Sequence, residues 1–234
     1  THIGRIDIPA SSTSTVTGEG PTRVETDVTY GPLTLERFEA GKIARLGVES
    51  TTFQVGGTPA VAAQGEMGPV VAETVDIVPL LVLLDPERRR KETEFRTVYG
   101  SIRAEKYSFR AENGTAETWA AMKVNDVALQ PSGVPAEDLR TVGRRVSEVA
   151  AQGREPAPQE VADLLVGIAG AYDALRIGGA SFEGLEAKEK DGPTVTVKSI
   201  ALGKLDGGRL DLIAIEGLAG KETDGASFRL DRLA

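Results

Sequence analysis

This chain of 234 residues offers few residue patterns that could form a catalytic or metal-binding site. His2 is the only histidine and cysteine is absent, so a Ser-His-Asp or Cys-His site has no base, and metal sites built on His or Cys are excluded. Four carboxylates remain as candidates, on turns or on the polar side of predicted strands: Asp206, Asp211, Asp224 and Asp231. We interpret them as structural, and we expect no catalytic residue, cofactor or metal, and no enzyme.

Short motifs add little chemistry. The glycines Gly167 and Gly170 lie within a helical pattern, unlike those of a dinucleotide-binding turn. Asn113-Gly114-Thr115 matches a glycosylation acceptor and equally an ordinary hairpin turn. Trp119 is the sole tryptophan, and we interpret it as a core or sheet-edge anchor, with a stacking platform for a base or sugar as the alternative.

The strongest pattern is a recurrent apolar spacing of two, three and two residues. It occurs at Leu33, Leu35, Phe38, Ala40; Ile102, Ala104, Tyr107, Phe109; Met122, Val124, Val127, Leu129; Leu175, Ile177, Ala180, Phe182; and Val195, Val197, Ile200, Leu202. A plain strand steps by two, and one extra residue is what a β-bulge inserts. The spacing therefore predicts bent strands with one apolar face, and its candidate residues are Phe38, Phe109, Val124, Phe182, Val197 and Leu202.

Residues 102–130 align with residues 175–203 at one constant offset, without a gap. Ser108 then matches Ser181, and Phe109 matches Phe182. We interpret this match as a diverged internal repeat of a hairpin. Two unrelated amphipathic hairpins that resemble each other are the alternative.

The predicted architecture is mainly strands. We expect strands at 1–8, around 24–30, and at 33–40, 43–55, 95–111 and 118–130, with an exposed loop at 10–20. Residues 175–234 predict an antiparallel meander, because Asp-Gly turns separate its apolar runs.

Two regions predict helices. Residues 69–84 are ambiguous, and we favour a buried helix whose solvated end is the charged run 85–94. Residues 135–152 and 159–174 carry apolar stripes at helical spacing and predict a helical hairpin packed across the apolar face. The fold class is α+β: curved antiparallel meanders with bulged strands. Its units are 1–130, a β unit with a helical insert, and 131–234, the hairpin and a second β unit, or else one continuous domain.

Charge and termini limit the partners and the context. A formal net charge of −8 argues against a general nucleic-acid or anionic-membrane surface, so we expect no nucleic acid partner. The one basic cluster, Arg88 to Lys91, is flanked by acidic residues. The chain opens at Thr1 in a strand-like segment and stops inside a repeat, so we expect a piece of a longer polypeptide. Abundant Ala, Gly, Arg, Glu and Val suggests a GC-rich bacterium.

The segments starting at Leu33 (LTLERFEAG) and Val195 (VTVKSIALGKLDGGRL) resemble the degenerate β repeats of AsmA- and TamB-like envelope proteins. That resemblance covers only the strands and implies a hydrophobic groove for lipid acyl chains and a periplasmic or envelope location. The sequence itself does not fix the compartment.

Two functions are compatible with these observations. The first is a non-enzymatic bacterial envelope protein that binds or conveys a lipid or other apolar ligand on a curved sheet. The alternative is a structural module of a larger repeat protein, with a closed core, no ligand, and neighbouring repeats of the same parent chain as partners.

Overall fold

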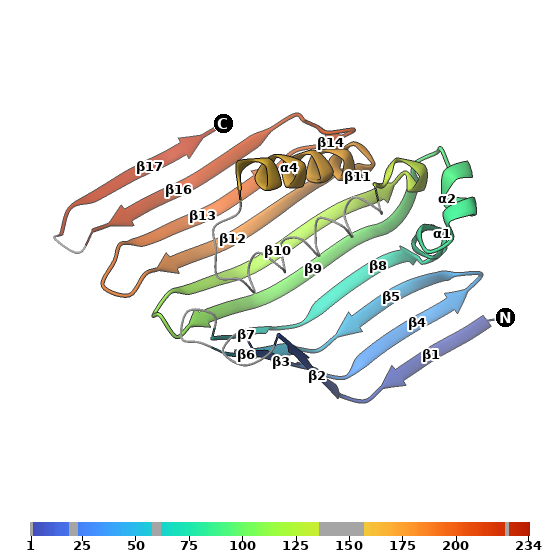
Figure 1. Ribbon diagram of the computed structural model, residues 1–234, viewed down its shortest axis with the longest axis horizontal. Helices are drawn as coiled ribbons and strands as arrows, with labels where there is room; N and C mark the ends of the chain where they lie inside the picture. The colour runs from blue at the N-terminus through green and yellow to red at the C-terminus, as the bar shows by residue number, and fades with distance from the viewer. Residues whose placement is uncertain (1, 19–22, 58–61, 136–156, 223–224) are drawn as a thin grey trace.

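The computed structural model describes residues 2–18, 23–57, 62–135, 157–222 and 225–234. The described strands form one open, antiparallel sheet, with β1 at one edge and β17 at the other (Figure 1). Short helices lie at one end of the sheet, and a longer helix lies over one part of it (Figure 1). The fold is thus mostly antiparallel sheet, and the α+β description holds only loosely.

Strands of the first half are β1 (His2–Ile8), β2 (Ser11–Thr17), β3 (Val24–Tyr30), β4 (Leu33–Glu39), β5 (Lys42–Val48), β6 (Thr51–Gly56), β7 (Ala63–Met67), β8 (Val70–Asp76), β9 (Arg96–Ala111) and β10 (Ala116–Leu129). Strands of the second half are β11 (Leu175–Ile177), β12 (Gly179–Lys188), β13 (Thr194–Leu202), β14 (Leu205–Asp206), β15 (Arg209–Leu210), β16 (Ile213–Lys221) and β17 (Ser227–Leu233). The helices are α1 (Val78–Leu83), α2 (Pro86–Lys91), the 3-10 turn η2 (Pro131–Gly133) and α4 (Pro158–Asp173).

Several of these strands are two halves of one longer strand. The register of β1 against β4 continues without a shift into β2 against β3. The same continuity joins β4–β5 to β3–β6, and β8–β9 to β7–β9. The strands of 1–130 and of 175–234 share this sheet, because β10 pairs with both β9 and β12.

Two kink lines cross the sheet from strand to strand. Positions facing one another across the pairs form the first kink line: Gly4, Arg37, Ala44, Thr74, Gly100, Asp126 and Gly178. The second kink line is Ala10, Gly31, Ser50, Gly68, Lys106, Ala120, Gly184, Lys198, Gly217 and Asp231. On alternate strands of the first line, and from β9 to β16 on the second, the kink residue is left-handed, with φ between 51° and 64° at Arg37, Thr74, Asp126, Lys106, Gly184 and Gly217.

Close approach at these lines explains the small residues opposite the left-handed ones. A Cβ added at Gly100 would lie 2.9 Å from Thr74 Cβ, and one added at Gly178 would lie 2.9 Å from Asp126 Cβ. Two side chains cannot share that space, so one partner of each of these pairs is glycine.

The kink lines explain the two-three-two spacing. The spacing was predicted to come from a β-bulge in each strand, and this prediction is wrong. Strand pairs keep one register through both lines, so no strand carries an unmatched bulge residue there. The register shift in the β9–β10 pair lies elsewhere, between Val127 and Ala128, opposite Val98. Instead, the paired strands each have their kink residue directly opposite that of the neighbouring strand, and the strands therefore bend together.

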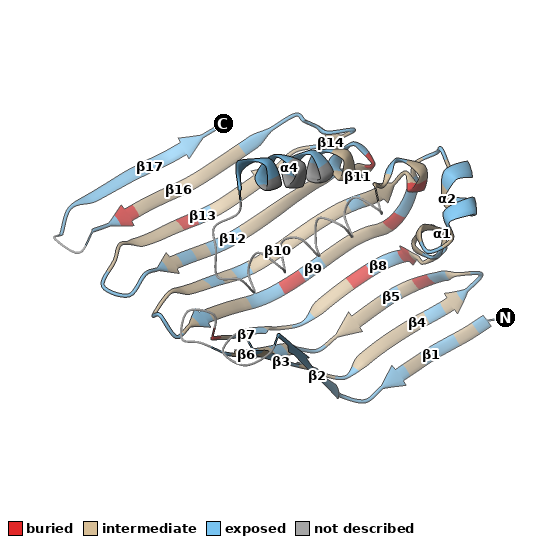
Figure 2. Cartoon of the chain, in the orientation of Figure 1, coloured by how far each residue is buried: buried red, intermediate tan, exposed pale blue. Residues whose placement is uncertain are grey.

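The largest buried cluster sits on the first kink line. Its buried members are Ile43, Ala72 and Val75, and the half-buried side chains against it include Leu35, Phe38, Leu46, Tyr99 and Ile102. Leu35 and Phe38 are three residues apart and still pack on the same cluster, as do Ala72 and Val75. This shared contact confirms that the kink returns the following side chains to the same face. Figure 2 shows that buried segments are few and scattered over the strands.

Substitution of Thr74 is a test of the energetic cost of the kink. A β-branched residue at φ 54° is strained, because its Cβ crowds the backbone. We expect Thr74→Gly to raise the free energy of unfolding by about 1 kcal/mol, measured by urea denaturation. The matched Thr52→Gly, in the regular strand β6, is expected to lower it by about 1 kcal/mol. Equal destabilisation by both would contradict a left-handed kink at Thr74.

Several predicted elements need correction. Residues 11–17, predicted as loop, form the edge strand β2, whose Ser and Thr side chains are all exposed. The strand predicted at 43–55 is interrupted after Val48, giving β5 and β6. In 69–84 the first part is strand β8, because Val71 and Val75 pair with neighbouring strands. Helix α1 follows, and it is not a buried helix: Leu81 and Leu84 are exposed.

The predicted helical hairpin is only partly described. Its first helix, predicted over 135–152, lies almost wholly outside the described residues. The second is α4, which ends against the buried Ala174 and leads into β11. Val161, Leu165 and Tyr172 of its predicted buried stripe are exposed, so these three side chains do not seal the sheet.

Candidate apolar ligand site

A hollow of about 320 Å³ lies on the second kink line, at the centre of the sheet. Its apolar wall consists of Met67, Ala104, Tyr107, Trp119, Ala121, Met122 and Phe182, and its polar members are Glu105, Lys106 and Glu117. The exposed surface of this hollow is almost entirely apolar. Its volume lies at the lower end of the range typical of small-molecule sites.

Strand register brings these side chains together. Tyr107 faces Trp119 across β9 and β10, and Ala104 faces Met122. Met122 in turn faces Phe182 of β12. The kink at Lys106 lets Ala104 and Tyr107, three residues apart, line the same hollow. The same kink therefore bends the sheet and brings these apolar side chains onto one wall.

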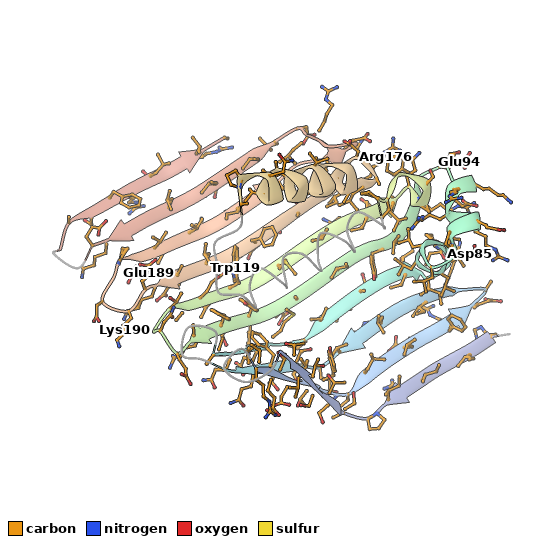
Figure 3. The ribbon with its side chains drawn as sticks, in the orientation of Figure 1. Asp85, Glu94, Trp119, Arg176, Glu189 and Lys190 are labelled. Atoms are coloured by element: carbon orange, nitrogen blue, oxygen red, sulfur yellow. The ribbon has the colours of Figure 1, made fainter. Side chains whose placement is uncertain are left out.

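Aromatic packing gives the hollow a firm wall. The Trp119 and Phe182 rings meet edge to face, with centroids 5.3 Å apart and planes at 60°. Such pairs contribute about 0.5–1.5 kcal/mol beyond area burial. Figure 3 shows Trp119 in the middle of the sheet, far from the helical corner that Asp85 and Glu94 mark.

Polar atoms sit at the margin of the hollow. The indole N–H of Trp119 donates to a carboxylate oxygen of Glu117. Burial raises the pKa of the Tyr107 phenol, and the nearby Glu117 carboxylate raises it further. Tyr107 is therefore neutral near neutral pH. The hollow thus offers an apolar surface with a few polar groups at its rim.

The six predicted apolar-face residues share a face but not a site. Phe182 lines the hollow, whereas Phe38 packs at the first kink line. Phe109 stacks on Phe53, with centroids 6.4 Å apart. Val124 and Leu202 are half-buried neighbours of Ala180, and Val197 is buried.

The sequence analysis did not predict Met67, Tyr107 or Trp119 as residues of one site. For Tyr107 and Trp119 a signal was present, because Tyr107 and Met122 belong to two-three-two segments and Trp119 lies three residues before Met122. The pairing of those segments across strands was the missing information.

Two of the four candidate carboxylates, those of Asp206 and Asp231, have ion-pair partners. Asp206 accepts from Lys204 and Arg176, and these hydrogen bonds, with Lys204 foremost, lower the pKa of its carboxyl. Asp231 pairs with Arg229, and the Asp211 backbone N–H donates to the Lys204 carbonyl. Asp224 lies outside the described residues. Among the residues that the structure describes, no group of three or more His, Cys, Asp or Glu could hold a metal.

A larger hollow of about 540 Å³ lies over β3, β6, β7, β9 and β10. Its exposed surface is polar and apolar in equal parts: the stacked Phe53 and Phe109 line it together with Asp27, Thr29, Thr52, Gln54, Gln64, Glu66, Ser108, Arg110 and Thr118. In the described chain no buried side-chain polar atom lacks a hydrogen-bond partner. This second hollow thus combines polar side chains with the Phe53–Phe109 pair.

Comparison with protein-family models, curated proteins and solved structures gives no match to this chain. No described helix is long and apolar enough to span a membrane. The fold and the hollow therefore describe this protein without a family: its described strands form an open antiparallel sheet that bends along two kink lines and carries an apolar, aromatic hollow.

Proposed function

We propose that this chain is a non-enzymatic protein of the bacterial envelope that binds an apolar or amphipathic ligand, such as a lipid acyl chain, on the kinked sheet. The observation that carries the proposal is the hollow at Trp119 and Phe182, whose exposed surface is almost wholly apolar. The envelope location rests on the resemblance of the strand segments to AsmA- and TamB-like repeats.

Size and shape support a chain-like ligand. The hollow follows the second kink line, and flanking apolar side chains, the half-buried Leu185 and the buried Val197, continue the same face. Burying one methylene contributes about 0.8 kcal/mol, so a chain of several methylenes gives useful affinity without any ion pair.

The sole tryptophan provides the test, because Trp119 is a wall of the hollow. We expect titration with dodecanoate to shift the Trp119 emission and to saturate. Dodecanoate should also displace 1-anilinonaphthalene-8-sulfonate, and solvent extraction of the purified protein should release lipid. An unchanged emission spectrum together with an empty extract would rule this function out.

The alternative is a structural module of a larger repeat protein. Two sheet edges favour it: within the described residues β1 pairs only with β4, and β17 only with β16. Edge strands of this kind can pair with a neighbouring chain or repeat. Longer polypeptides that self-associate and bind no probe would favour this function.

A further inference from the structure

The aromatic hollow also holds a negative charge. Among its three polar residues, Glu105 and Lys106 are neighbours in the chain, exposed to solvent and opposite in charge. Glu117 differs from both, because it is half-buried and makes no ion pair with any described residue. A half-buried carboxylate without a paired cation gives the hollow a negative potential, since water and salt screen it less than they screen an exposed group.

Strand register fixes Glu117 beside the aromatic rings. Glu117 and Trp119 are two residues apart on β10, so their side chains lie on one face of the sheet. The Trp119 indole N–H donates to the carboxylate and holds it at the margin of the hollow. Burial first, and then the charge of this carboxylate, raise the pKa of the Tyr107 phenol, so the charge of Glu117 also acts on the facing strand β9.

Three aromatic rings meet beside this charge. Tyr107 faces Trp119 across β9 and β10, and Trp119 packs edge to face on Phe182. The face of an aromatic ring is electron-rich, and a cation within about 6 Å of the ring centroid is attracted to it. Aromatic rings and a carboxylate around one hollow are thus complementary to an organic cation.

The apolar wall restricts the kind of cation further. A primary ammonium or a guanidinium group carries several N–H donors, and each donor that is buried without an acceptor costs free energy. The exposed surface of the hollow is almost entirely apolar and offers few acceptors besides Glu117. A trimethylammonium group has no N–H donor and carries its charge under a surface of methyl groups, which is the kind of cation that aromatic cages bind.

We propose that the hollow recognises the trimethylammonium group of a quaternary-ammonium amphiphile, with Tyr107, Trp119 and Phe182 around the methyl groups and Glu117 as the counter-charge. This inference rests on the proposed function, because it assigns a headgroup to the ligand of the same hollow. The alkyl chain of the ligand lies along the apolar face beside Leu185. Charge complementarity selects a cationic head over an anionic one.

Isothermal titration calorimetry with two amphiphiles of one chain length tests the choice of headgroup. Dodecyltrimethylammonium is expected to bind the full chain at least tenfold more tightly than dodecanoate, with both ligands below their micelle concentrations. Tetramethylammonium chloride, which has the head without the chain, should displace dodecyltrimethylammonium. Sodium chloride at the same concentration should displace it much less.

Glu117→Gln removes the charge and keeps an acceptor for the Trp119 N–H. It should weaken dodecyltrimethylammonium binding about tenfold, between the effects of a fully solvated and a buried charge pair. The affinity for dodecanoate should stay equal or rise, which also shows that the variant is folded. Glu186→Gln is the matched control, because Glu186 is exposed and faces Thr118, whose side chain points to the other side of the sheet from Glu117. It should change neither affinity by more than about twofold.

The outcomes separate this inference from the proposed function. Equal affinity for the two amphiphiles, or equal weakening by Glu117→Gln and Glu186→Gln, overturns the trimethylammonium site and leaves apolar ligand binding in place. If neither amphiphile binds, the proposed function fails and the inference fails with it. Tighter binding of dodecyltrimethylammonium that Glu117→Gln reduces and Glu186→Gln does not supports both.

Discussion

Replacing Phe182 with alanine is expected to weaken binding of an apolar ligand about tenfold. The Phe182 ring forms one wall of the hollow and holds the Trp119 ring in place, at 5.3 Å between centroids. Contact with one such side chain contributes about 1.5 kcal/mol, which corresponds to about tenfold in affinity. The measurement is the dissociation constant for dodecanoate from Trp119 emission.

The same variant is expected to lower the free energy of unfolding by about 2 kcal/mol, below the range for a fully buried phenylalanine because Phe182 is half-buried. Phe228→Ala is the matched control: this phenylalanine lies on the edge strand β17 and is 51% exposed. It should leave the affinity unchanged and cost less than about 1 kcal/mol in stability. Equal affinity in the Phe182 variant and the wild type would show that ligand does not enter this hollow.

Replacing Gly184 with valine is expected to lower the free energy of unfolding by about 3 kcal/mol. Gly184 has φ +64°, a conformation that a β-branched residue adopts only with strain. An added Cβ would also lie 2.8 Å from Ala120 Cβ, on the facing strand β10. Both effects arise because Gly184 is the kink residue of β12, which carries Phe182 and pairs with β10, the strand that carries Trp119.

Gly4→Val separates the kink geometry from the general effect of a larger side chain. Gly4 also lies on a kink line, at the sheet edge, but a Cβ there would meet nothing within 4 Å. We expect it to change stability by less than about 0.5 kcal/mol, as for surface substitutions generally. Urea denaturation of the two variants gives the comparison. A similar loss for both would mean that the backbone at Gly184 relaxes, and that the second kink line is not needed for the fold.

Coordinated kinks offer a physical account of how this single-layer sheet keeps its shape. A single layer of strands buries little, and among the described residues the buried side chains are few. Placing a left-handed residue at one level in alternate strands folds the layer along a line, so side chains on both sides of the line contact one another. The cluster at Ile43 and Val75 and the hollow at Trp119 each lie on such a line. The bend supplies the packing that a second layer supplies in a sandwich.

The sequence predicted much of this arrangement. Alternating apolar residues and Gly-containing turns, such as Asn113-Gly114 with φ +90° at Gly114, predicted the strands β9 and β10 and the hairpin that joins them. The two-three-two spacing predicted the shared apolar face, because a strand must keep its apolar side chains on one side whatever bends it. The absence of cysteine and of all but one histidine limited, by composition alone, the chemistry that the chain can perform.

Other features depended on pairing between distant strands. Val71 and Val75 fit a helical stripe, yet they form strand β8, because both pair with β5 and Val71 also pairs with β9. The Ser- and Thr-rich residues 11–17 form strand β2 for the same reason, through pairing with β3. Local spacing also could not distinguish a bulge in one strand from a line of kinks. A bulge shifts the register between paired strands and a line of kinks does not, and this register becomes known only when the strands are paired. What the residues alone determined was which side chains share a face, and what tertiary structure decided was which of them meet across strands to form the hollow.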